Sequence, residues 1–181
     1  MKKIKNQTIC MIALFTAVIS IMAQFSIPLP FGVPLSLQNF AVALTAILLG
    51  SQYGTLSIII YLALGVIGLP VFANFRSGLQ TIFSPAGGFL LGYPFMAYLI
   101  GIGSKYHYKK SIFSIFIFLG YLIDYLIGLI VFCLITSTDI KTGIITCILP
   151  FLPAELIKAS LAGMLGLQLK KKLYFLFHTN I

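Results

Sequence analysis

Charged residues are scarce in this chain of 181 residues, and acidic ones are almost missing. Only 8% of the residues are charged, with 3 Asp and Glu against 12 Lys and Arg, while 60% are hydrophobic. A soluble globular domain carries about 25% charged residues. The composition therefore excludes a water-solvated fold and indicates an integral membrane protein. Because the chain has so little polar surface, its net charge of +9 is better explained by membrane topology than by a nucleic-acid partner.

Cysteine and the common catalytic motifs are scarce as well. Cys10, Cys133 and Cys147 lie in apolar segments without metal-ligand spacing, so we expect small buried side chains, with no disulfide framework and no metal. No GxxxxGK[ST], GxSxG or HExxH motif occurs, which leaves no phosphate-binding loop, nucleophile elbow or zinc-peptidase site of the usual kind. We therefore expect no cofactor, and any transport energy has to come from a gradient or another subunit.

Apolar segments of spanning length divide the chain. A membrane helix needs about 20 mainly apolar residues, so the chain holds roughly six with short loops. Residues 70–85 mix polar and aromatic residues and predict an ordered loop that partly covers or enters the membrane face. We predict an all-α integral membrane protein in which residues 1–181 form a single transmembrane domain, with six transmembrane helices at about 8–25, 37–49, 55–69, 86–103, 112–137 and 143–169.

Lysine clusters predict the orientation, because basic residues collect on the cytoplasmic side of short loops. With six spans and the N-terminus inside, only Arg76 and Lys141 fall in outer loops. The sequence therefore predicts a multi-pass protein of the cell membrane with cytoplasmic N- and C-termini. Three clusters then lie inside: Lys2, Lys3 and Lys5; Lys105, Lys109 and Lys110; and Lys170, Lys171 and Lys172.

Three ionisable residues fall within the predicted spans: Asp124, Glu155 and Lys158. Each costs about 2.5–3.5 kcal/mol at a helix centre, so each requires a reason. Glu155 and Lys158 stand at i,i+3, which places them on nearly one face of a helix. An internal ion pair that only holds helices in register is one explanation. A solute-binding site is the other, since intramembrane ionisable residues usually mark a pathway.

Further polar residues extend this candidate site. Asn74 and Arg76 lie in the outer loop, where they either reach an incoming solute or are simply solvated. Tyr93, Tyr121 and Tyr125 are candidates for its walls, because a tyrosine hydroxyl deep in a membrane needs a hydrogen-bond partner. Together the acids, amides and basic groups suit a small amphipathic solute with one carboxylate and a neutral hydrogen-bonding head.

Four segments in matching order carry a resemblance to a known family. They read IPLPFGVPLSLQ at 27–38, GLPVFA at 68–73, SPAGGF at 84–89 and LPFLPAELIKA at 149–159. The chain closely resembles the BioY family, the biotin-binding S components of energy-coupling factor (ECF) transporters. The resemblance implies a six-helix bundle that captures biotin from outside. It also implies docking on a transmembrane coupling subunit driven by two ABC-type ATPase subunits, so the chain itself is no enzyme.

The resemblance also suggests roles for single residues. Asp124 and Lys158 match an acid and a lysine expected at the vitamin, and Asn74 falls in the loop that covers the pocket. Many relatives have glycines where this chain has Asn74-Phe75-Arg76-Ser77, and they often have Asp in place of Glu155. The AxxxA spacing of Ala13 and Ala17 matches the docking face of the first helix.

The chemistry of biotin is consistent with these residues. Its ureido ring suits Asp124 together with an amide such as Asn74 or Gln38. Its valerate carboxylate suits either Lys158 or Arg76, and the sequence leaves both open. Other functions also remain open: an S component for another small vitamin, a BioY-like protein without the energising module, a purely structural subunit, or an intramembrane enzyme that uses Asp124 and Glu155.

Overall fold

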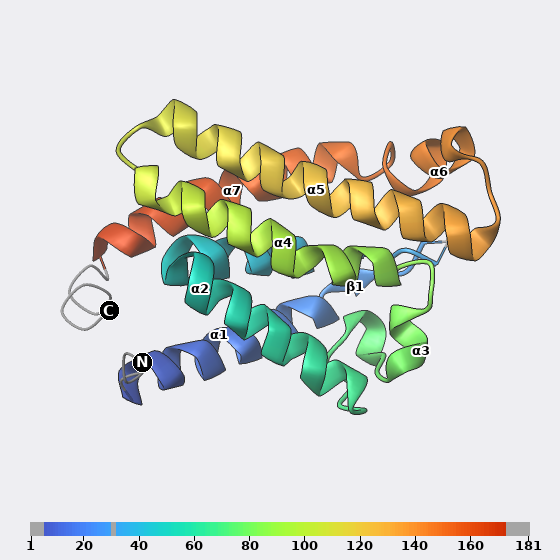
Figure 1. Cartoon of the computed structure of the whole chain (residues 1–181), viewed down its shortest axis with the longest axis horizontal. Helices are drawn as coiled ribbons and strands as arrows, with labels where there is room; N and C mark the ends of the chain where they lie inside the picture. The colour runs from blue at the N-terminus through green and yellow to red at the C-terminus, as the bar shows by residue number, and fades with distance from the viewer. Residues whose placement is uncertain (1–5, 30–31, 173–181) are drawn as a thin grey trace.

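The protein is a bundle of long helices (Figure 1), seen in a computed structural model that describes residues 6–29 and 32–172. The lysines at positions 2, 3 and 5 lie outside the described residues. A two-residue antiparallel pair, β1 with β2, is the only sheet in the described ranges. The elements are α1 (Asn6–Gln24), β1 (Ser26–Ile27), β2 (Leu35–Ser36), α2 (Gln38–Val66), η1 (Ala73–Phe75), α3 (Leu79–Ile82), α4 (Gly87–Gly103), η2 (Ser104–Tyr106), α5 (Lys110–Thr136), α6 (Ile140–Cys147) and α7 (Leu152–Lys172).

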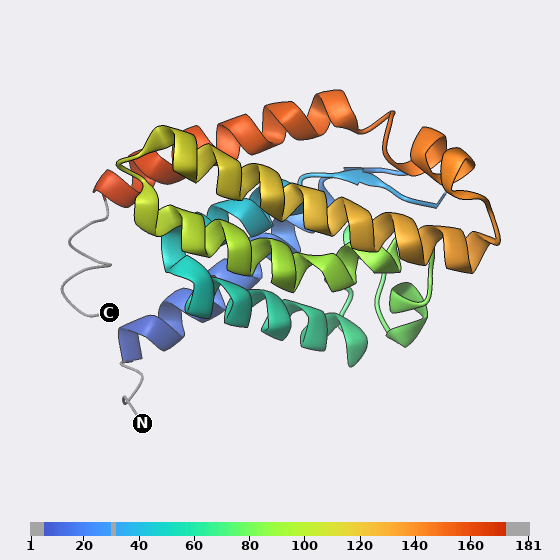
Figure 2. The ribbon, with the colours of Figure 1, turned by 45° about the horizontal axis from the view of Figure 1, so that its top comes forward.

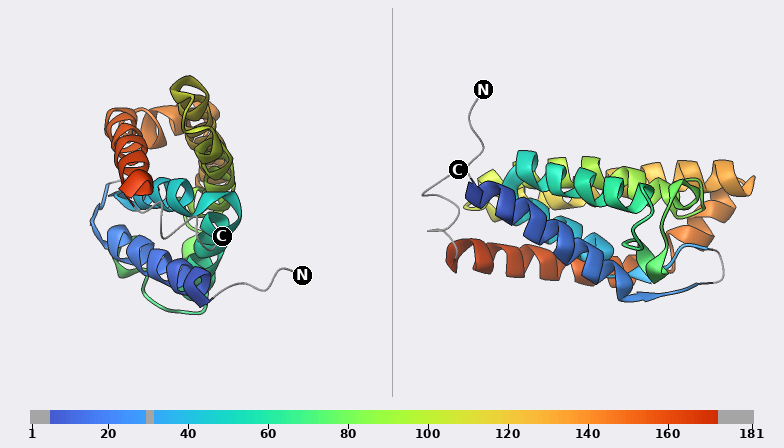
Figure 3. Two further views of the ribbon diagram at one scale, coloured as in Figure 1. Left: turned by 90° about the vertical axis from the view of Figure 1, so that its left-hand side faces the viewer. Right: turned by 90° about the horizontal axis from the view of Figure 1, so that it is seen from below.

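Helix α4 forms the centre of the bundle, packed between α2 and α5. Helix α1 packs on α2, and α7 packs on the other side of α2 while it contacts α5 only slightly. The end-on view in Figure 3 shows α7 and α5 standing apart on the same side of the bundle. The helices thus form one interlocked group with a loosely closed seam between α5 and α7.

Helix α2 folds back on itself at Gly50. This residue has φ +76° and ψ −176°, a conformation that suits glycine and ends the first arm of the helix. The Gln38 Nε2 atom lies 2.6 Å from the Tyr61 hydroxyl, although 23 residues separate them. A straight helix would hold them about 35 Å apart. The predicted spans at 37–49 and 55–69 therefore correspond to two arms of α2 that meet at Gly50, and the second arm already begins at Ser51.

The predicted span at 143–169 is also interrupted. Helices α6 and α7 meet at an angle of 59°. Pro150 lies in the break, and Pro153 is the second residue of α7. A proline lacks the N–H that a continuing helix needs and clashes with the preceding turn, so one straight helix cannot cross this segment.

Four helical segments are long and apolar enough to cross a membrane within the described residues: α1, α2, α4 with η2, and α5. A fifth is present if α6 and α7 count as one bent span. The all-helical, membrane-embedded prediction is confirmed. The count of four or five falls short of the expected six, since α2 counts once although its two arms run in opposite directions.

The segment at 70–85 is ordered, as predicted. Phe72 is 1% exposed and stands edge-on to Tyr61, at a ring-centroid distance of 5.5 Å. It fits because residue 65 is glycine: a Cβ atom there would lie 2.1 Å from the Phe72 ring. Gln24 at the end of α1 donates to the Phe72 carbonyl at 3.2 Å. These contacts fix the loop over the ends of α1 and α2.

The expectation that all three cysteines are buried is only partly right. Cys147 is buried and Cys133 is partly buried, whereas Cys10 is exposed on α1. The reason is the position of α1 at the edge of the bundle, where it packs on α2 through one face only. A small apolar residue there is free to face the surroundings.

Candidate functional site

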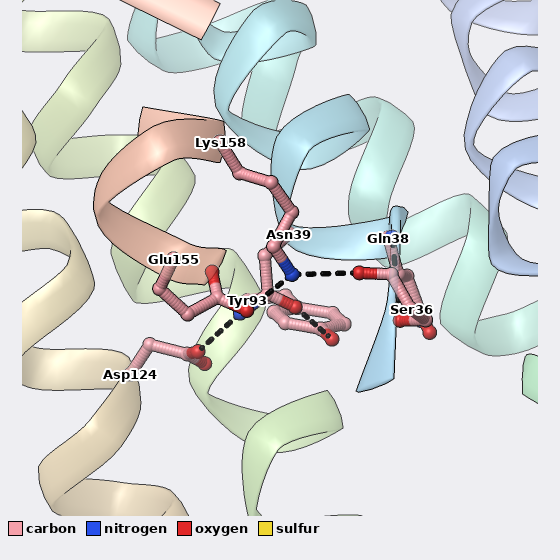
Figure 4. Close-up of polar contacts among 7 residues, drawn as sticks. All are labelled: Ser36, Gln38, Asn39, Tyr93, Asp124, Glu155 and Lys158. Carbon is pink, nitrogen blue, oxygen red and sulfur yellow. Dashed lines mark hydrogen bonds and ion pairs between the residues drawn. The ribbon is translucent and has the colours of Figure 1, made fainter. Parts of the chain in front are cut away.

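Seven buried polar residues meet between β2, α2, α4, α5 and α7 (Figure 4). None has more than 7% of its surface exposed. Buried polar groups at this depth are costly unless they are hydrogen-bonded, so their clustering marks a built site. The residues are Ser36, Gln38, Asn39, Tyr93, Asp124, Glu155 and Lys158.

A close approach of α4 and α5 positions Asp124. Gly92 allows it, because a Cβ atom at this position would lie 2.4 Å from Asp124 Oδ1 and 3.0 Å from Asp124 Cα. One turn earlier, a Cβ atom on Gly88 would lie 3.0 Å from Gly128 Cα. These glycines leave room for the two backbones to approach each other, the usual role of small residues between membrane helices. Asp124 is consequently fully buried against α4.

Asn39 connects the acid to the neighbouring helices. Its Oδ1 accepts a hydrogen bond of 2.8 Å from the Tyr93 hydroxyl, and its Nδ2 lies 3.5 Å from Asp124 Oδ2. The sequence analysis missed Asn39 as a site residue. The available signal is its position directly after Gln38, a predicted site residue, at the start of an apolar segment.

Lys158 joins α7 to β2. Its ammonium forms an ion pair with Glu155 and donates a 2.7 Å hydrogen bond to the Ser36 carbonyl. The shared helix face predicted from their i,i+3 spacing is confirmed. On the other side of Ser36, Gln38 donates to the Tyr61 hydroxyl, which donates in turn to the Val71 carbonyl at 3.2 Å. This chain of contacts links the site to the loop at 70–85.

A pocket opens onto one side of the cluster. Its free volume of about 50 Å³ is smaller than the roughly 300–1,000 Å³ of sites that enclose drug-sized ligands, so a solute of that size has to displace lining side chains. Arg76 lines the pocket and is exposed to the surroundings. The polar part of the lining comprises Ser36, Gln38, Asn39, Arg76, Thr81, Tyr93, Tyr125 and Glu155.

The structure divides the predicted site residues into three groups. Gln38, Arg76, Tyr93, Tyr125 and Glu155 line the pocket, while Asp124 and Lys158 lie behind this lining and contact it through Asn39, Glu155 and Ser36. Asn74 belongs to neither group. Its carboxamide oxygen accepts from Ser26 Oγ at 2.9 Å. Ala13 and Ala17 lie on the exposed face of α1, outside the site.

Three buried oxygen atoms at this site have no hydrogen-bond partner among the described residues: Asp124 Oδ1, Glu155 Oε2 and Tyr121 Oη. Unpartnered buried oxygens are expensive, and a bound molecule that donates hydrogen bonds removes the cost. No group of three or more metal-ligating side chains lies within the described ranges. The unpartnered oxygens therefore suit a bound molecule that donates hydrogen bonds.

The match to a family model establishes the family of the chain. The model of the BioY family matches residues 1–175. The chain belongs to the BioY family. It is 40% identical over 161 residues to a biotin transporter BioY of Thermotoga maritima, across 87% of this chain and 92% of that protein. It is 35% identical over 167 residues to a probable biotin transporter BioY of Pyrococcus horikoshii, across 92% of this chain and 98% of that one.

A solved structure agrees with the sequence relationship. The crystal structure of the S component for biotin from an ECF-type ABC transporter matches with a TM-score of 0.85 and 30% identity. The match covers 93% of this chain and 95% of that one. The resemblance drawn from four segments is thus confirmed, and the BioY family is one of transporter components rather than enzymes.

Proposed function

We propose that this chain is the biotin-capturing S component of an ATP-driven ECF transporter, an integral protein of the cell membrane that takes up biotin. Membership of the BioY family carries this proposal, together with the match to the biotin S component. The pocket with its buried polar wall supplies matching chemistry, because it combines acceptors, amides and a cation with apolar side chains.

The ureido head of biotin fits the deep end of the pocket. The ring presents two N–H donors and one carbonyl acceptor. Glu155 Oε2 has no partner in the described part of the chain and is available to accept from one N–H. Lys158, behind the lining, holds this carboxylate in place through their ion pair. Asp124 acts through Asn39, whose amide it holds in orientation with Tyr93 on the opposite side.

The carboxylate of biotin belongs at the mouth of the pocket, next to Arg76. Biotin is elongated, so a head bound among the deep acceptors directs the tail outward. Arg76 is exposed there and forms no ion pair among the described residues, whereas Lys158 is already paired with Glu155. An Arg–carboxylate pair adds charge-assisted, often bidentate hydrogen bonds. We therefore assign the carboxylate to Arg76 rather than to Lys158.

Capture requires movement of the loop at 70–85, because the pocket is narrower than the ligand. Phe72, Ala73 and Arg76 of this loop line the pocket. The loop is anchored to α2 through the bond between Tyr61 and the Val71 carbonyl. Binding therefore shifts a segment held by a few named contacts and leaves the helices in place. Asn74, tied to Ser26, belongs to this cover.

Six crossings with both termini cytoplasmic remain the topology that we propose. The antiparallel arms of α2 serve as the second and third crossings, and α6 with α7 as the sixth. Lys170 near the end of α7 donates to the Ser104 carbonyl at 3.1 Å and to the Ile47 carbonyl at 3.3 Å. This contact supports placing the lysines of 105–110 and of 170–172 at one end of the bundle, as the positive-inside rule requires.

The energising partners are proposed to be a transmembrane coupling subunit and two ABC-type ATPase subunits. Ala13 and Ala17 on the exposed face of α1 provide a docking surface, because small side chains let another helix approach closely. Helix α1 contributes no residue to the lining of the pocket. Docking and capture are thus separable on this chain.

Calorimetry on the purified chain in detergent tests the proposal. Biotin is expected to bind with higher affinity than other small vitamins, and Arg76→Gln is expected to weaken binding by about 1.5–3 kcal/mol. Biotin methyl ester, which lacks the charge, is expected to bind wild-type and Arg76→Gln equally. Lys141→Gln removes a distant exposed cation and serves as the control. No binding of biotin by folded protein would overturn the function. If Lys158→Gln, and not Arg76→Gln, binds biotin no better than its methyl ester, the assignment of the carboxylate to Arg76 is overturned.

A further inference from the structure

A long groove runs along the bundle between α5 and α7, on the seam where these helices hardly touch. The two helices lie side by side in Figure 2, and the groove between them has a volume of about 700 Å³. Its walls are mainly apolar. The lining residues near one end are Phe113, Ser114, Ile117, Phe118, Gly163 and Leu167. In a membrane such a groove faces hydrocarbon rather than water, so an apolar chain is its natural occupant.

One end of the groove is strongly basic. Lys110, the first residue of α5, lines the groove at this end, opposite Gln168 of α7. Lys105 and Lys109 are exposed just before it, and Lys171 and Lys172 are exposed at the end of α7. The chain contains only three acidic residues, and none lies at this end. The basic end therefore lacks internal counter-charges and is complementary to an anionic headgroup.

The stretch of the groove from Lys110 to Tyr121 matches one leaflet of a bilayer, and the lining continues beyond it to Leu126. Lys110 and Tyr121 are separated by eleven residues of α5, a distance of about 16 Å along the helix. Half of the hydrocarbon core of a bilayer is about 15 Å. At the level of Tyr121 the wall becomes polar through Tyr121, Tyr125 and Glu155. An acyl chain that starts beside Lys110 would thus end where the polar site begins.

We propose that this groove binds an anionic phospholipid of the leaflet on the Lys110 side. One acyl chain lies between α5 and α7, and the headgroup is bound by Lys110 and Lys109. Tyr125 and Glu155 line both the groove and the solute pocket, so this chain replaces the missing contact between α5 and α7 directly below the pocket. The binding of the lipid does not depend on which solute the pocket takes.

Native mass spectrometry of the detergent-purified full chain, titrated with phosphatidylglycerol or phosphatidylcholine, tests the proposal. One phosphatidylglycerol is expected to bind more tightly than phosphatidylcholine. Lys110→Gln is expected to weaken it about fivefold. Ser114→Phe fills the groove from an exposed position and is expected to weaken it about tenfold, the cost of excluding roughly two methylene groups.

Two variants provide matched controls. Ser111→Phe adds the same ring to an exposed position of α5 that does not line the groove, and Lys141→Gln removes an exposed lysine elsewhere. Both are expected to bind phosphatidylglycerol like wild-type. Wild-type affinity in Ser114→Phe, or equal affinity for the two lipids, would overturn the proposal. A lipid-free dimer that Ser114→Phe converts to monomer would assign the groove to a second copy instead, and would overturn it as well.

Discussion

The Asp124→Asn variant tests whether Asp124 serves the stability of the fold or the binding of biotin. The carboxylate is fully buried; among the described residues its Oδ1 has no partner, and its one hydrogen bond, from Asn39 to Oδ2, is long, at 3.5 Å. Lys158 forms its ion pair with Glu155 and not with Asp124. Asparagine keeps the shape of the side chain and still accepts from Asn39. The substitution therefore removes the charge and little else.

In Asp124→Asn, the stability of the unliganded protein is expected to rise, whereas the affinity for biotin is expected to fall. A buried charge without a close cation costs free energy, so its removal is expected to stabilise the unliganded protein by about 1 kcal/mol or more. For a chain of this size, that corresponds to a rise in Tm of about 2–4 °C. Biotin binding is expected to weaken by about 0.5–1.5 kcal/mol, the worth of one ordinary hydrogen bond, because Asp124 acts on the ligand only through the orientation of Asn39. This corresponds to a factor of about two to ten in Kd.

Two measurements on one preparation check this prediction: thermal unfolding without ligand, and calorimetric titration with biotin. Asp139→Asn is the matched control. Asp139 caps α6, accepting from the Thr142 N–H at 3.2 Å, and lies far from the site. Since asparagine caps helices about as well as aspartate, both readouts should stay at wild-type values. A lower Tm with unchanged biotin affinity in Asp124→Asn would refute the reasoning and make Asp124 a structural residue.

Three further predictions concern packing, the loop and docking. Gly92→Ala places a Cβ atom 3.0 Å from Asp124 Cα and should lower stability by about 1–3 kcal/mol in thermal unfolding. Gly163→Ala meets only the ends of two side chains, Ile117 Cδ1 at 3.2 Å and Phe113 Cε1 at 3.8 Å, and should raise stability by about 0.5–1 kcal/mol, so equal effects would contradict the packing argument. Tyr61→Phe removes the 2.6 Å acceptor of Gln38 Nε2 and the donor to the Val71 carbonyl, so hydrogen exchange around residue 72 should become faster. Unchanged exchange would show that Tyr61 does not anchor the loop at 70–85. The double variant Ala13→Leu with Ala17→Leu should abolish biotin uptake in cells and leave biotin binding unchanged, whereas Ser111→Leu should affect neither. Loss of binding in the double variant would show that docking and capture are not separable.

The sequence predicts the helices well because each span is limited by its length and by its interruptions. Helices α1, α4 and α5 begin and end within two residues of the predicted limits. The predicted spans differ from the helices at two places, where a glycine or a proline interrupts the helix more abruptly than the apolar segments indicate. Gly50 alone reverses α2, because a positive φ turns the backbone without a loop. At 148–151 the chain bends between α6 and α7, because a proline removes a helix hydrogen bond.

The residue types at the site were predictable from the sequence, whereas the contacts between these residues were not. Charge within a span marked Asp124, Glu155 and Lys158, because their cost in a membrane demands a reason. Asn39 does not stand out in the same way, because an uncharged polar side chain is ordinary at the start of a helix such as α2. Its role depends on Gly92, which lets α4 approach α5 closely enough for Asp124 to reach Asn39. That approach is a property of the packed bundle and has no signature in spacing along the chain.

The three intramembrane charges therefore do different work, although the sequence presents them as one set. Lys158 balances Glu155 and ties α7 to the Ser36 carbonyl, so this pair holds the wall of the pocket in place. Asp124 has no such counter-charge and faces Asn39. A protein selected for stability alone would gain by replacing an acid in that position. Its presence is explained by binding, because Asp124 orients the Asn39 amide at the pocket wall, next to a Glu155 oxygen that has no partner among the described residues and that a ligand N–H would satisfy.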